Sequence, residues 1–220
     1  MKDFLKQAGI LIIAGALGFG AVNFIKNVYY SDSSKKAAKK VNKEFGNEIE
    51  LAKEKASPDK FATEILQEKF SKLAEKKLSE ETSLKKKLSS AGDYFSGAYV
   101  LNVRGRPAYC ASLGVSMDNF VSSYKQQNKK IFEIVKEIKI QEATEHKLSK
   151  PVDNDMLYKM LKPTVDKMVL LDMEDTAKIL NVSKKEACHL LEQNHKTMAE
   201  ELDFRKQAPK IAQLLLESAH

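Results

Sequence analysis

The chain has 220 residues, which is enough for one domain of ordinary size together with a helical extension. Hydrophobic residues make up 43% of it and charged residues 30%, so it can bury a core. Only nine glycines and five prolines interrupt it, and this argues against a sheet-rich fold with many turns. The net charge of +7 is concentrated near the N-terminus rather than gathered on the rest of the chain, which argues against a nucleic-acid-binding protein.

An uncharged, mostly apolar segment covers residues 8–25, with Lys2 and Lys6 before it and Lys26 after it. Eighteen helical residues rise about 27 Å, enough to cross the hydrocarbon core of a bilayer. A short basic start before an apolar centre is also the pattern of an export signal, with Gly18 and Gly20 as small residues at a cleavage site. We therefore expect residues 1–34 to be a membrane anchor or a signal segment, with membrane lipid as the partner of residues 8–25.

A block of five lysines without an acidic residue comes after this segment: Lys35, Lys36, Lys39, Lys40 and Lys43. Near an anionic membrane surface, each such lysine contributes about 1 kcal/mol to binding; a solvated helix face explains the same residues. Counted literally, the lysines favour a cytoplasmic location for the C-terminal domain. The short basic leader and the two cysteines favour export, and we expect a membrane-anchored, extracytoplasmic (periplasmic) domain.

The remaining chain shows helical periodicity throughout, which predicts an all-α fold. We expect a Lys/Glu-rich helical stalk over residues 35–56, then an irregular bundle of about five to seven helices over residues 57–220. In chain order, the pattern predicts helices that start at Ser57 and Leu84, a break at residues 102–107, and a long helix from Met117 that ends before Pro151. Two shorter helices, separated near Pro163, and helices that start at Ser183 and Pro209 complete the bundle.

Cys110 and Cys188 are the two cysteines of the chain, and each lies in an apolar, helical context. In an exported protein two cysteines commonly pair, and closing so long a loop stabilises a fold by about 4 kcal/mol. Two buried thiols in a cytosolic protein are the alternative. We predict the disulfide, and this prediction depends on export.

Residues 176–191 resemble a DNA-binding helix-turn-helix. The resemblance lies in the positions that would be buried or in the turn: Ala177, Asn181, Val182, Ala187 and Leu190. It implies that the second helix would enter the major groove of DNA. Residues 174–203, however, contain four lysines and seven acidic residues, a net charge of 4 − 7 = −3, which would repel phosphates. A well-capped helical hairpin explains the same residues.

Arg104 and Arg106 flank Gly105 in the predicted break and are candidates for contact with an anion or a partner, since loop arginines hold phosphates and carboxylates. His189, Glu192 and His195 do not have the spacing of a zinc-binding helix. The sequence contains no nucleotide-binding loop, no nucleophile elbow and no set of metal ligands. We expect no metal and no cofactor.

Taken together, these patterns favour a membrane-tethered helical interaction or scaffold module of the cell envelope, without evident catalysis. Its partner would be another envelope protein or a second copy of the chain. The first alternative is a cytoplasm-facing, membrane-tethered DNA-binding regulator that uses residues 176–191. The second is a binder of small anions, or an enzyme, built around Arg104 and Arg106.

Overall fold

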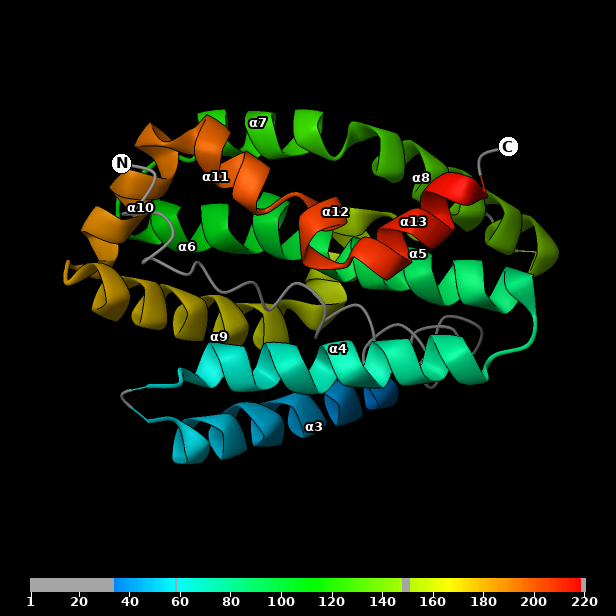
Figure 1. The fold of residues 1–220 in the computed structure, drawn as a ribbon, viewed down its shortest axis with the longest axis horizontal. Coiled ribbons are helices and arrows are strands. Elements are labelled where there is room, and N and C mark those ends of the chain that lie inside the picture. The colour runs from blue at the N-terminus through cyan, green and yellow to red at the C-terminus, as the bar shows by residue number, and fades with distance from the viewer. Residues whose placement is uncertain (1–33, 58, 148–150, 219–220) are drawn as a thin grey trace.

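The computed structural model describes residues 34–57, 59–147 and 151–218, and these residues form a bundle of helices (Figure 1). Within them there is no strand beyond one isolated bridge between Ser57 and Lys60, so the predicted all-α class is confirmed for this part of the chain. No helix in these three ranges is both long and apolar enough to cross a membrane. The apolar segment 8–25 lies outside the described residues.

The helices succeed one another with short connections. In chain order they are α3 (Ser34–Lys55), α4 (Ala62–Glu80), α5 (Leu84–Val100), the π-helix η1 (Leu101–Gly105), α6 (Arg106–Ser112), α7 (Asp118–Gln127), α8 (Lys129–Glu145), α9 (Asn154–Leu180), α10 (Lys184–Gln193), α11 (His195–Glu201), α12 (Phe204–Gln207) and α13 (Pro209–Glu217). The bundle is therefore divided into more helices than the five to seven expected, because several of them are only one or two turns long.

Three layers can be traced in Figure 1: α3 with α4, then α9 with α5, η1 and α6, then α7 and α8 with α11 to α13. The expected stalk, residues 35–56, forms α3, whose buried Phe45, Ile49 and Ala52 pack in the same core as the helices of the bundle. The rings of Phe45 and Phe70 stack with their centroids 5.1 Å apart and join α3 to α4. On the other side of the core, the Phe204 ring meets Phe95 edge-on at 5.1 Å.

Helix boundaries differ from the predicted ones at four places. Residues 102–107 are not a break, because α5 continues through η1 into α6. The long helix expected from Met117 divides at Asn128 into α7 and α8. Pro163 lies inside α9 rather than between two helices, and its sequence neighbours Leu161, Thr164 and Val165 are buried. Helix α4 begins at Ala62 rather than near Ser57. Its N-terminus is capped by the Glu64 carboxylate, which accepts the Phe61 N–H at 3.0 Å.

Candidate functional site

The π-helix η1 lies against the middle of α9, and a glycine makes this close approach possible. A Cβ atom at Gly105 would lie 2.6 Å from Val165 Cγ1 and 2.9 Å from Val169 Cγ2, both shorter than a normal contact. In this π-helical turn the Arg106 N–H bonds to the carbonyl of Leu101, five residues earlier, and such widened turns inside α-helices are frequent at functional sites. Here the wider turn directs the next side chain, Arg106, toward α9. The glycine predicted to mark a turn is instead a site of helix packing.

Arg106 is fully buried, pairs with Asp172 of α9 and begins a helix, so it does not lie in the break that the sequence predicted. The Arg106 Nε donates to Asp172 Oδ2 at 2.9 Å, and Nη1 donates to the side-chain oxygen of Asn102. Within the described residues Asp172 Oδ1 accepts no hydrogen bond. Burial raises the pKa of Asp172, and the charge of Arg106 opposes this rise. The pair therefore holds η1 and α6 on α9.

Arg104 points elsewhere. It forms an exposed ion pair with Asp155 near the start of α9, and its side chain is 46% exposed, whereas that of Arg106 is 0% exposed. The structure thus does not bring the two guanidinium groups to one anion site. Of the two candidates, Arg104 is the one that solvent reaches.

Cys110 and Cys188 form the predicted disulfide, with their Cα atoms 5.7 Å apart. Both residues are fully buried, and the bond joins α6 to α10 across 78 positions of sequence. Since α6 begins at Arg106, the disulfide and the Arg106–Asp172 pair lie one turn apart on the same short helix. Together they attach α6 covalently to α10 and by charge to α9.

Residues 176–191 form the end of α9, a turn and the start of α10. Asn181 adopts the left-handed conformation in the turn (φ 52°), and the Ser183 hydroxyl accepts the Glu186 N–H at 3.1 Å, as the capping pattern predicted. Lys184, which would face DNA in a helix-turn-helix, donates to Glu174 at 2.8 Å. The disulfide fixes the buried face of α10 to α6. These contacts match the capped helical hairpin.

Glu192 has a role that the sequence did not indicate. Its two carboxylate oxygens accept the backbone N–H groups of Asn119 and Phe120, at 3.0 and 2.9 Å, and so cap the N-terminus of α7 from α10. His195 Nδ1 lies 2.7 Å from the Ser123 hydroxyl oxygen, across the α7–α11 interface. No group of three or more His, Cys, Asp or Glu side chains in the described ranges could hold a metal ion.

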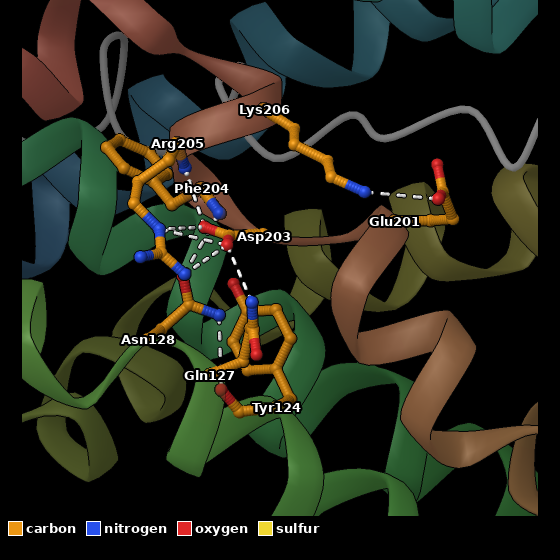
Figure 2. A network of polar contacts seen from close by, with 8 residues as sticks. All are labelled: Tyr124, Gln127, Asn128, Glu201, Asp203, Phe204, Arg205 and Lys206. Atoms are coloured by element: carbon orange, nitrogen blue, oxygen red, sulfur yellow. Dashed lines mark hydrogen bonds and ion pairs between the residues drawn. The ribbon is translucent and has the colours of Figure 1, made fainter.

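A network of hydrogen bonds around Asp203 connects the bend between α7 and α8 to the turn between α11 and α12 (Figure 2). The Asp203 carboxylate accepts from Gln127 Nε2 at 2.7 Å, and from the backbone N and Nε of Arg205 at 2.9 Å each. Asn128 accepts the Phe204 N–H at 3.0 Å. Burial alone would raise the pKa of Asp203, but the hydrogen bonds from Arg205 and Gln127 outweigh it and lower that pKa.

A second charge cluster, only partly exposed, lies between α5 and α8, where Lys139 pairs with the buried Asp93 and, at 3.0 Å, with Glu142. Burial would lower the pKa of Lys139, but the two carboxylates raise it. Glu142 of this cluster also lines a groove of about 820 Å³, whose apolar part is formed by Leu84, Leu88 and Ile138. Leu84 is 61% exposed, the highest value among the large hydrophobic residues that are exposed in the described part of the chain. The sequence did not indicate this groove, because its two walls are about 50 residues apart.

The described fold is thus a disulfide-stapled helical bundle in which buried charges join helices to one another and a groove opens between α5 and α8. Comparisons with protein-family models, with curated proteins and with solved structures found no match for the chain.

Proposed function

We propose that this protein is a membrane-tethered interaction or scaffold module of the cell envelope, with its helical bundle on the extracytoplasmic side. The buried Cys110–Cys188 disulfide is the observation that carries the proposal. Disulfides form and persist in oxidising compartments, whereas the cytosol keeps thiols reduced. The disulfide agrees with a chain whose first residues have the pattern of an anchor or an export signal.

The interaction role is supported by how the polar side chains are used. Arg106, Asp172, Glu192 and Asp203 each bond to another helix or cap a helix end, and so serve the fold. The groove between α5 and α8 is different, because Leu84, Leu88 and Ile138 line a hollow at the surface. Apolar side chains of a partner protein would bury this surface, and the lysines and glutamates at its rim would orient the partner.

The compartment is tested with the full chain in intact cells. We expect Cys110 and Cys188 to resist a thiol reagent until a reductant and a denaturant are added, after which both react. A reporter fused after His220 that is active only in an oxidising compartment should be active. A Cys110→Ala/Cys188→Ala variant is the control for labelling. Because both cysteines are buried, the decisive condition is denaturant without reductant: thiols that react there, or an inactive reporter, would overturn the extracytoplasmic proposal.

The partner is tested by photo-crosslinking from the groove. A photoreactive amino acid at Leu88 should give a crosslinked protein product in cells, whereas the same amino acid at Leu170, an exposed apolar position on α9 that does not line the groove, should not. Equal crosslinking from both positions would show that the groove is not a specific interaction surface.

A further inference from the structure

Four lysines from three helices surround a second hollow, of about 540 Å³, at the end of the bundle where α4 ends and α5 begins. Lys72 and Lys76 come from α4, Lys87 from α5 and Lys210 from α13; the one acidic residue in the lining is Glu75. The lining therefore carries a net charge of 4 − 1 = +3. Leu78, Ile211 and Leu214 supply its apolar part. We call this set of residues the lysine hollow.

Part of this positive charge is not balanced by the protein. Glu75 is bonded to Lys210 at 2.8 Å, and Lys76 lies 3.7 Å from Glu80. Lys87 forms no ion pair with a described residue, and Lys72 forms none either, although its charge helps to lower the pKa of Glu68, which is itself paired with Lys60. Lys87 also belongs to a run with Lys85 and Lys86 at the start of α5, where the helix has no acidic residue in its first turn. Cations at a helix N-terminus are unfavourable, so an anion from outside the chain would relieve this repulsion.

The position of the hollow indicates which anion. Helices α3 and α4 run antiparallel, since Phe45 stacks on Phe70 and Lys69 pairs with Glu48. The start of α3, to which residues 1–33 are joined, therefore points toward the end of α4, as Figure 1 shows. The block of lysines at positions 35–43 occupies this same start of α3. If residues 8–25 enter a membrane, the lysine hollow is at the end of the bundle nearest to it.

We infer that the lysine hollow docks the bundle on the surface of a membrane that contains anionic lipids, with headgroup phosphates among the lysines and the apolar lining against the upper part of the acyl chains. This inference rests on the proposed membrane tether. Each lysine near an anionic surface strengthens binding about fivefold, which corresponds to about 1 kcal/mol. Salt weakens such contacts by screening, whereas it does not remove an inserted apolar segment.

The test uses the absence of tryptophan from the chain. A Ser79→Trp variant of the full-length protein carries a single tryptophan at the edge of the lysine hollow. Ser112→Trp is the matched control, because both serines are exposed in the last turn of a helix and donate to the carbonyl three residues earlier. Each variant is reconstituted into vesicles of phosphatidylcholine, with or without phosphatidylglycerol, that carry brominated acyl chains as quenchers.

We expect the Ser79→Trp fluorescence to be quenched only in the vesicles that contain phosphatidylglycerol. The quenching should disappear at about 0.5 M salt, because salt at that concentration strongly screens the charges. The Ser112→Trp fluorescence should be unquenched in both. Lys72→Gln/Lys87→Gln should reduce the docking equilibrium constant on the order of 30-fold, because two lysines are neutralised. Lys129→Gln/Lys130→Gln, exposed lysines in the first turn of α8, should leave it unchanged.

Flotation of the vesicles separates this inference from the tether. If the protein floats with both kinds of vesicle but the Ser79→Trp fluorescence shows no lipid-dependent quenching, the docking is overturned and the tether stands. The same result is expected if the hollow binds an acidic protein segment instead of lipid. Protein that fails to float with either kind of vesicle would overturn the tether.

Discussion

Arg106 and Asp172 are 66 positions apart in the sequence, yet their side chains form a fully buried ion pair with Arg106 Nε 2.9 Å from Asp172 Oδ2. The pair exists because the π-helix turns Arg106 toward α9 and Gly105 lets the two helices approach. A fold tolerates two charges removed from water only while both are present, since either one alone would be left buried without a counter-charge.

Removing one member of this pair should destabilise the protein strongly. We expect Arg106→Met to lower the free energy of unfolding by about 3–5 kcal/mol, because the buried carboxylate of Asp172 loses its partner. In the Arg106→Met/Asp172→Leu double variant the loss should be much smaller, since no buried charge remains. Urea denaturation of the four proteins of this cycle measures the coupling. Additive effects of the two substitutions would contradict the pairing.

Gly105→Ala should destabilise the bundle by about 1–3 kcal/mol, because the new methyl group would overlap the branched side chains of Val165 and Val169. Gly92→Ala in α5 is the matched control. There the nearest side-chain atom, Val135 Cγ1, would lie 3.5 Å from the added methyl group, an ordinary contact, and alanine should stabilise the helix by up to about 1 kcal/mol. The melting temperatures of the two variants should therefore move in opposite directions.

Reduction of the Cys110–Cys188 disulfide should lower the stability by about 4 kcal/mol, because opening a loop of this length increases the entropy of the unfolded chain. The measurement is thermal unfolding with and without dithiothreitol. Cys110→Ala/Cys188→Ala should unfold at the same temperature under both conditions. If the unfolding temperature of the wild-type protein is the same with and without the reductant, the disulfide is absent or contributes nothing to stability.

Glu192→Ala should lower the free energy of unfolding by about 1 kcal/mol, because the backbone N–H groups of Asn119 and Phe120 lose their acceptor. Hydrogen exchange should report the loss in the first turn of α7, although the substitution is in α10. Gln193→Ala, at the exposed neighbouring position, should leave the exchange of α7 unchanged. If Glu192→Ala accelerates exchange in α10 alone, the capping contact does not form in solution.

Asp203 should make the protein sensitive to acid. Its pKa is lowered in the folded state, so the unfolded chain binds a proton more readily. This contribution to stability is complete above the unfolded pKa of 3.8 and is lost as the pH falls through the lower folded pKa. The free energy of unfolding of Asp203→Asn, measured between about pH 2 and pH 5, should therefore fall less with acid than that of the wild type. If the free energy of unfolding of both proteins changes in parallel with pH, Asp203 does not contribute to the acid sensitivity.

The all-α class and the disulfide could be read from the sequence because both leave local signals. Apolar residues recur at helical spacing along the whole domain, and Ser183 and Pro209 mark the starts of α10 and α13 as predicted. Cys110 and Cys188 are the two cysteines of the chain, so within the chain they have only each other as partners.

The helix boundaries that were predicted wrongly depend on contacts that no local pattern records. Residues 102–107 contain glycine and proline and so indicate a break, but packing on Val165 and Val169 keeps them helical. Pro163 stays inside α9 because the side chains around it are buried in the core. The free energy gained by burying several apolar side chains is larger than the free energy lost with the one hydrogen bond that a proline cannot donate.

What the sequence determines by itself is therefore the helical class, the presence of two cysteines that can pair and the uneven charge, since each depends on residue type and spacing. Only the tertiary structure decides that Arg106 faces Asp172, that Glu192 caps α7 from another helix, and that lysines of α4, α5 and α13 share one hollow. These relationships join residues that are far apart along the chain, and they arise when helices pack at a particular distance and rotation, which hydrophobic periodicity does not specify.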